Sequence, residues 1–190
     1  EGLATLLKAL AVSGTQTLWV EPLTYPDAVL MARNERMEVR CLPENPAEIP
    51  RTVSGMKPSD ALYLIPSFHN PLGRTLALGL RREILAETVR TGTWVIEDDA
   101  YGELRYGEES VPALKSLPEA ERVLYLGSFS QVLFPGLRFG YMLLHPSLAE
   151  VAGAVRRIRT GGASSLVQML VANLIETGDL SRALDTARRQ

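Results

Sequence analysis

Short runs of apolar residues alternate with amphipathic stretches along the whole chain. Apolar residues spaced three and four apart predict helices, whereas brief continuous apolar runs predict buried strands. The near-continuous run at 61–65 is typical of a parallel strand covered on both faces. The predicted strands are 18–20, 37–42, 61–65, 94–96, 122–126 and 139–144. The predicted helices are 26–35, 76–90, 147–159, 165–176 and 180–189.

The opening stretch, residues 3–11, is also apolar. It lacks the basic segment that precedes the apolar part of a signal sequence, and the chain starts with Glu1 rather than Met. Its leucines recur at helical spacing, so we expect an amphipathic core helix in a piece of a longer polypeptide. No stretch approaches the ~20 apolar residues of a membrane-spanning helix.

The alternation of strands and helices predicts an α/β fold, a three-layer sandwich with a mostly parallel sheet and helices on both faces. The 190 residues fit one domain, and 46% hydrophobic with 22% charged residues is an ordinary soluble composition. A net charge of −2 and the lack of a basic run argue against a nucleic-acid surface in this segment. Cys41 is the only cysteine, which excludes an intrachain disulfide and favours a reducing, cytoplasmic compartment.

Four polar clusters directly follow predicted strands, where parallel sheets bind their ligands. The first, 21–26, holds Tyr25, an aromatic that could stack on a flat ring or simply pack within a proline-bounded turn. The second, 66–73, holds Asn70, whose amide offers donors and an acceptor next to a rigid proline. A structural turn before the next helix is the alternative for this cluster.

The third cluster, 97–101, places Glu97, Asp98 and Asp99 just before Tyr101. Three carboxylates at a strand end repel one another, so we expect a cation or a protonated partner beside them. A protonated ring nitrogen of a cofactor would serve, and ionised Asp98 would keep it protonated. A metal ion ranks lower because neither histidine lies near this cluster in the sequence. A solvent-exposed acidic surface is the third interpretation.

The fourth cluster spans 127–138. Ser128 and Ser130 carry hydroxyl donors, and Arg138 carries a planar cation suited to phosphate. The alternative is a strand, a turn and a further strand with an incidental arginine.

Together the four clusters resemble the motifs of fold-type I, class I/II aminotransferases, which depend on pyridoxal 5′-phosphate. The similarity is greatest to the alpha-aminoadipate and aromatic aminotransferase subgroup and its relatives fused to transcription regulators. Its motifs read E-x-P-T-Y, P-S-F-Q-N-P-T-G, E-D-D-x-Y and G-S-F-S-K-x-L-x-P-G-L-R, and matching segments occur here in that order. The resemblance implies the large domain of that fold, amino acid and 2-oxo acid substrates, and a homodimer.

By resemblance, Asp98 would pair with the ring nitrogen of the cofactor, and Tyr25 would stack on the ring. Asn70 and Tyr101 would both reach its phenolic oxygen. The phosphate would be held by Ser128, Ser130 and Arg138.

Position 131 departs from the family pattern. Relatives have a lysine there that binds the cofactor as a Schiff base, whereas this chain has Gln131. A carboxamide cannot form the imine or act as the amine base that moves the substrate proton. Of the set implied as catalytic, Gln131, Asp98 and Tyr101, only the last two keep their chemistry, so we expect no turnover. Lys8, Lys57 and Lys115 follow no strand in a matching motif and are not expected to substitute.

The resemblance also implies a division of the chain. Residues 1–178 would be the cofactor-binding large domain, incomplete at its start, and 179–190 the beginning of a helix toward a small domain. One alternative function is a non-catalytic domain that binds or senses pyridoxal phosphate, as in aminotransferase-like transcription regulators. A truncated remnant is less favoured, because random decay would not spare nearly all of the pocket residues.

Overall fold

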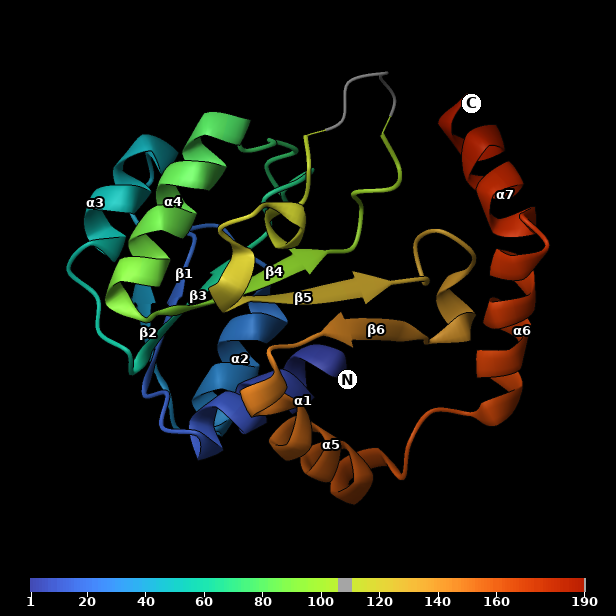
Figure 1. The fold of residues 1–190 in the computed structure, drawn as a ribbon, viewed down its shortest axis with the longest axis horizontal. Helices are drawn as coiled ribbons and strands as arrows, with labels where there is room; N and C mark the ends of the chain where they lie inside the picture. Colours follow the sequence, from blue (N-terminus) through green and yellow to red (C-terminus); the bar gives the residue numbers. More distant parts are fainter. Residues whose placement is uncertain (106–110, 190) are drawn as a thin grey trace.

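The computed structural model describes residues 1–105 and 111–189. One sheet of six strands has the order β2-β1-β3-β4-β5-β6, in which only β6 runs antiparallel to its neighbour (Figure 1). The strands are β1 (Thr17–Val20), β2 (Glu38–Cys41), β3 (Asp60–Leu64), β4 (Trp94–Asp99), β5 (Val123–Ser128) and β6 (Gly140–Leu143).

Helices cover both faces of this sheet, which confirms the predicted three-layer architecture (Figure 1). On one face lie α1 (Gly2–Val12), α2 (Pro26–Asn34) and α5 (Pro146–Thr160); on the other lie α3 (Ile49–Val53) and α4 (Leu78–Thr91). In the described part of the chain, four short 3₁₀ turns lie between these elements: η1 (Pro46–Glu48), η2 (Leu114–Ser116), η3 (Ala120–Arg122) and η4 (Pro135–Leu137).

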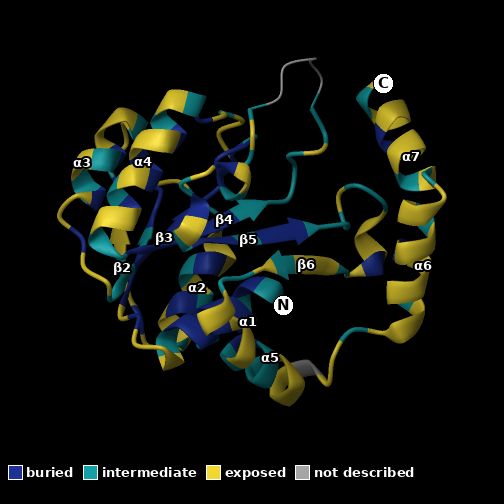
Figure 2. Ribbon diagram, in the orientation of Figure 1, coloured by how far each residue is buried: buried dark blue, intermediate teal, exposed yellow. Residues whose placement is uncertain are grey.

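The central strand β3 explains why its sequence is continuously apolar. Successive side chains point to opposite faces of a strand. Tyr63 therefore joins the core under α1 and α2, whereas Leu62 and Leu64 join the core under α3 and α4. Both faces are buried, so neither set of alternate positions can be polar (Figure 2).

Helix α4 buries a charged side chain and leaves an apolar one exposed. Val89 is 45% exposed, whereas Arg81 is fully buried. The guanidinium of Arg81 donates to the backbone oxygens of Leu76, Pro66 and Pro112 at 2.7–2.9 Å. Because its donors are satisfied, this charged residue can take the place of an apolar one at the helix–sheet interface.

Strand β4 is longer than predicted and includes all three acids of the third cluster. Asp98 pairs with Leu126 of β5, and Asp99 pairs with Gly127. Alternation along the strand sends Asp98 to one face of the sheet and Glu97 and Asp99 to the other.

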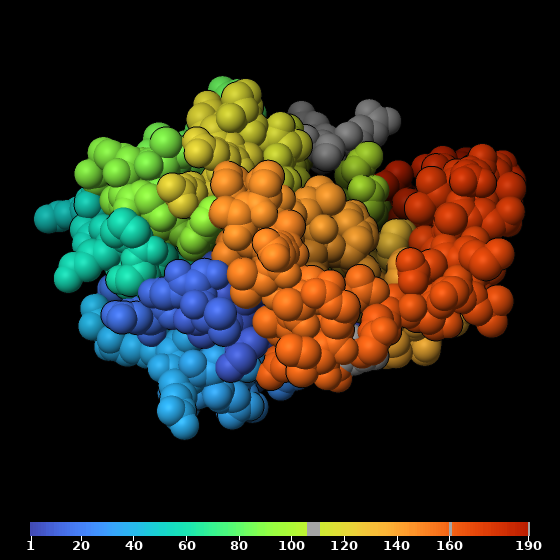
Figure 3. Space-filling model, turned by 60° about the horizontal axis from the view of Figure 1, so that its bottom comes forward, coloured from blue at the N-terminus to red at the C-terminus, as the bar shows by residue number. Residues whose placement is uncertain are grey.

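The last two helices, α6 (Ser165–Glu176) and α7 (Asp179–Arg188), form a lobe at one end of the molecule (Figures 1 and 3). Gly178, with φ of 73°, separates them at the predicted boundary, and the domain division itself stays a prediction. Arg188 of α7 donates from Nη2 to Glu103 Oε2 at 2.7 Å and from Nε to the Glu103 carbonyl at 2.8 Å. Within the described residues, no helix is long and apolar enough to cross a bilayer.

Candidate functional site

The carboxyl ends of the parallel strands gather the four polar clusters at one edge of the sheet. Strands β1, β3, β4 and β5 run parallel and end at 20, 64, 99 and 128, directly before or within the clusters. Clusters that lie far apart in the sequence are therefore neighbours at this edge, as the sequence predicted.

Asp98 is a half-buried acid at this edge. Its Oδ2 accepts a hydrogen bond from the Tyr63 hydroxyl at 2.6 Å, across the β3–β4 pairing. Burial raises the pKa of Asp98 above the ordinary carboxyl value, although the bond from Tyr63 opposes that effect. The Tyr63 pKa is raised as well, by burial first and then by the Asp98 charge. Tyr63 thus holds the carboxyl group in a fixed orientation.

Tyr25 lies within electrostatic range of Asp98 and Arg138. It occupies the N-cap position of α2, and its hydroxyl donates to Asp27 Oδ2 at 2.6 Å. This bond raises the Tyr25 pKa; the Asp98 charge raises it further and the Arg138 charge lowers it. Both charged groups are therefore close enough to act on the same phenol. The structure brings a ring, an acid and a cation from three different clusters together.

Asn70 and Tyr101 meet at a neighbouring hollow of about 440 Å³. Asn70 belongs to the loop after β3, and its peptide bond to Pro71 is cis. The Asn70 side chain is exposed and makes no hydrogen bond to any residue that the structure describes. Its amide is free to bind a ligand in this hollow.

The loop after β5 is shaped by close backbone approach. A Cβ on Gly140 would lie 2.6 Å from the Gly127 carbonyl oxygen, so only glycine fits that position. Within the loop, the Ser130 amide donates to Ser128 Oγ at 3.2 Å. Gln131 follows with an exposed side chain.

Arg138 closes the same loop in a left-handed conformation, with φ of 48° and ψ of 42°. Its guanidinium is exposed and forms no ion pair with a carboxylate in the described part of the chain. An unpaired planar cation at this edge suits an anionic ligand.

The three acids of β4 each have a hydrogen-bond donor of their own, and for Asp98 and Asp99 that donor is a tyrosine hydroxyl, a protonated partner of the kind expected from sequence. Asp98 is bonded to Tyr63, Asp99 accepts from the Tyr125 hydroxyl at 2.9 Å, and Glu97 lies wholly buried behind them. Glu97 accepts the backbone amides of 114 and 115 at 2.7 and 2.8 Å. Strand alternation separates the carboxylates, and each finds its own donor. Across 1–105 and 111–189, no three His, Cys, Asp or Glu side chains gather in a group suited to a metal ion.

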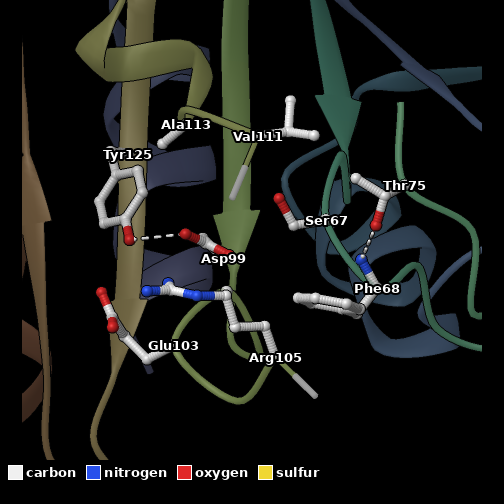
Figure 4. A pocket seen from close by; sticks show the side chains of 10 residues that line it. Ser67, Phe68, Thr75, Asp99, Glu103, Arg105, Val111, Ala113 and Tyr125 are labelled. Atoms are coloured by element: carbon white, nitrogen blue, oxygen red, sulfur yellow. Dashed lines mark hydrogen bonds between the residues drawn. The ribbon is translucent and has the colours of Figure 1, made fainter. Parts of the chain in front are cut away.

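A second cavity, of about 310 Å³, lies on the side of β4 that Asp99 faces (Figure 4). The Asp99–Tyr125 bond forms part of its wall, and Ser67 and Thr75 face it from the loop after β3 (Figure 4). Strand alternation places this cavity on the opposite face of β4 from Asp98. Phe68 lines both this cavity and the hollow of Asn70 and Tyr101.

The three lysines lie away from the carboxyl edge. Lys115 Nζ donates to the carbonyl of Val123, the first residue of β5, at 2.7 Å. Lys8 Nζ lies 2.9 Å from Glu35 Oε2, just past the end of α2. Lys57 precedes the first residue of β3. No lysine amine is placed to take over the role expected at position 131.

Sequence reasoning missed two residues that support the site, Tyr63 and Glu21. Tyr63 sits inside an apolar strand, where a hydroxyl needs a partner, and this polar tip was the available signal. Glu21 is 1% exposed, although it belongs to a loop motif in which only Tyr25 was considered. Both residues act through partners that are distant in the sequence.

Comparison with known proteins places this geometry in a family. The family model for aminotransferase class I and II matches residues 1–190. The 2-aminoadipate transaminase of Thermus thermophilus is 40% identical over 131 residues, which are 67% of this chain and 33% of that protein. The uncharacterized HTH-type transcriptional regulator YhdI of Bacillus subtilis is 35% identical over 127 residues, 67% of this chain and 27% of that protein.

The solved structures agree. LysN, the alpha-aminoadipate aminotransferase of Thermus thermophilus complexed with N-(5'-phosphopyridoxyl)-L-leucine, matches with a TM-score of 0.84 and 31% identity over 98% of this chain. The chain spans about half of that structure and about a third or less of these two relatives. Because the family model covers every residue, the chain belongs to the fold-type I, class I and II aminotransferases, a family that depends on pyridoxal 5′-phosphate.

Proposed function

We propose that this chain is the cofactor-binding large domain of an aminotransferase-like protein that holds pyridoxal phosphate without a covalent bond. One observation at the carboxyl edge of the sheet supports the proposal: the cofactor-binding chemistry is retained, but the amine at position 131 is missing. Residues from four loops converge there with the chemistry that the cofactor needs, while position 131 offers a carboxamide in place of an amine.

The residues present fit the cofactor. Asp98 is a half-buried acid held by the Tyr63 hydroxyl, suited to keeping a proton on a ring nitrogen. Tyr25 provides a flat ring within electrostatic range of Asp98, and Arg138 provides a cation that is unpaired among the described residues. The remaining proposed contacts are Asn70 and Tyr101 at the phenolic oxygen and Ser128 and Ser130 at the phosphate.

When bound, pyridoxal phosphate supplies an electron-withdrawing ring that stabilises negative charge on a substrate carbon. The role of this chain would be to orient that ring, keep its nitrogen protonated at Asp98 and shield one ring face with Tyr25. Gln131 cannot take up or return the proton of an amino acid substrate, because a carboxamide is not basic near neutral pH. Binding without transfer between an amino acid and a 2-oxo acid is the expected behaviour.

Further parts of the proposal rest on relatives. Residues 1–178 would form the large domain and 179–190 would lead into a small domain that completes the substrate site. A homodimer in the cytoplasm is proposed on the same grounds.

A regulatory role is the second candidate. The relatives include YhdI and a probable rhizopine catabolism regulatory protein, MocR, of Rhizobium meliloti, which is 35% identical over 136 residues. Loss of the amine at position 131 favours a domain that binds the cofactor, or its adduct with an amino acid, without turnover. Such a domain would report cofactor or amino acid levels to an attached segment.

One substitution tests the proposed function. Gln131→Lys would be made in the natural polypeptide, with Gln131→Arg as a control that adds a cation but no nucleophilic amine. We expect the lysine variant, after addition of pyridoxal phosphate, to show the visible absorption band of the lysine-bound cofactor, and the arginine variant to lack it. Amino transfer to 2-oxoglutarate would favour an aminotransferase ancestor, whereas a band without transfer would favour the regulatory role. No band in the lysine variant would overturn both.

A further inference from the structure

Glu21 is a buried carboxylate that binds the loop after β3, the strand next to β1. It follows the last residue of β1 and is 1% exposed. Its Oε1 accepts from Arg74 Nη2 at 2.8 Å, and its Oε2 accepts from the Ile65 amide at 3.2 Å. His69 Nε2 lies 3.0 Å from Oε2, in a close contact that is not a well-aligned hydrogen bond. All three partners belong to the end of β3 or to the loop that follows it.

Two of these partners are also the residues that close the turn bearing Asn70. The His69 amide donates to the Arg74 carbonyl at 2.8 Å, and the Gly73 amide donates to the His69 carbonyl at 2.6 Å. Asn70 lies inside this closed turn. Glu21 therefore contacts the side chains on both sides of the turn that presents Asn70.

The Asn70 side chain has no hydrogen-bonding anchor of its own among the described residues. Its position at the hollow is therefore set by the backbone of its turn. Arg81 fixes the start of this loop, with Nη2 2.7 Å from the Pro66 carbonyl and 3.0 Å from Ser67 Oγ. Glu21 is the buried group that contacts the later part of the same loop, at His69 and Arg74.

The free-energy cost of burying a carboxylate indicates how strongly Glu21 holds the turn of Asn70. A charged group without water must be compensated by hydrogen bonds, and charge-assisted bonds such as that from Arg74 are the strong ones. If the turn moved away, Glu21 would lose the charge-assisted bond from Arg74 and the contact with His69. The carboxylate and the turn therefore stabilise each other.

We propose that Glu21 is a positioning residue, which links the loop of Tyr25 to the loop of Asn70 and so sets the distance between the ring-stacking and oxygen-binding sides of the cofactor site. The inference rests on the proposed function, since Asn70 acts on the cofactor only there. Glu21 itself does not touch the cofactor in this proposal.

Hydrogen exchange tests, without any cofactor, whether Glu21 holds the turn of Asn70. Glu21→Gln would be compared with Glu35→Gln in the 190-residue chain. Glu35 is a matched control, because its side chain is 7% exposed and bound by both Lys8 and Arg159, on α1 and α5. We expect amides of 66–75 to exchange about tenfold faster in Glu21→Gln, since losing a charge-assisted bond opens the turn, and to be unchanged in Glu35→Gln. Equal exchange of these amides in both variants would overturn the proposal.

Arg74→Met is the milder second variant, should Glu21→Gln fail to fold. It removes the donor to Oε1 but keeps the aliphatic part of a side chain that is 27% exposed. Faster exchange confined to 66–75 is again the supporting result, and unchanged exchange there contradicts the proposal that Glu21 holds the turn.

A spectroscopic measurement tests the positioning of Asn70. In the Gln131→Lys background, Glu21→Gln should weaken pyridoxal phosphate binding by roughly tenfold and shift the pH midpoint of the visible band, because the phenolic oxygen loses a well-placed donor. Glu35→Gln should leave both unchanged. An unchanged affinity and midpoint alongside a loosened turn would refute the positioning role. Absence of the band with Glu21 intact would instead refute the proposed function, and the exchange comparison would still decide whether Glu21 holds the turn.

Discussion

Glu97 makes the stability of this protein depend on pH near neutrality. It is fully buried at β4, and burial raises its pKa from the ordinary 4.5 to about 7, against the opposing effect of the amides of Lys115 and Leu114. Between these two values the folded state binds a proton that the unfolded state has released. Stability must therefore fall as pH rises through this window.

The shift from 4.5 to about 7 gives the magnitude. At about 1.4 kcal/mol per pKa unit, the Glu97 contribution to the free energy of unfolding changes by roughly 3 kcal/mol. It is fully present below the ordinary value and is lost above the raised one. Burial also raises the pKa of Asp98 and Asp99, so their contributions have the same sign.

Urea unfolding at several pH values between about 5 and about 8 measures this dependence, and Glu97→Gln isolates one residue. The glutamine cannot ionise, so its unfolding free energy should change by roughly 3 kcal/mol less over that range than that of the unsubstituted chain. Glu35→Gln is again the control, and its free energy of unfolding should change with pH as much as that of the unsubstituted chain. If the free energy of unfolding changes equally with pH in the unsubstituted chain and in Glu97→Gln, the reasoning is refuted. They would mean that the amides of 114 and 115 keep Glu97 ionised throughout.

Two further predictions concern the residues around β4. Gly102→Ala would make a Cβ collide with the Asp99 carboxylate, so we expect the free energy of unfolding in urea to fall by about 1–3 kcal/mol. Gly79→Ala on α4, where nothing lies within 4 Å, should not destabilise, and equal losses in the two variants would contradict the steric argument. Tyr63→Phe removes the bond that lowers the Asp98 pKa, so the carboxyl should titrate higher by NMR, and an unchanged titration would show that the hydroxyl does not hold Asp98.

The architecture was predictable because its signals are local. The apolar run of β3 and the amphipathic helices report burial through spacing alone, and parallel strands dictate which ends meet. The convergence of Tyr25, Asp98 and Arg138 follows from that topology together with the family motifs. Their roles toward the cofactor stay predictions.

The supporting contacts were not predictable, because they depend on partners far away in the sequence. Glu21 and Arg74 are separated by 53 residues, and Tyr63 and Asp98 by 35. The division of the three acids of β4 between the two faces of the sheet was not predictable for a related reason. The prediction ended β4 before the acids, whereas the strand continues through them and sends neighbouring side chains to opposite faces.

Titration of the unsubstituted chain with pyridoxal phosphate, followed by borohydride reduction and mass measurement, tests most directly whether the pocket survives without its covalent bond. We predict saturable binding at about one cofactor per chain that Asp98→Asn weakens, and no mass adduct after reduction. Absence of binding would contradict the retained pocket. A stoichiometric adduct on Lys8, Lys57 or Lys115 would contradict the conclusion that no lysine replaces the missing amine.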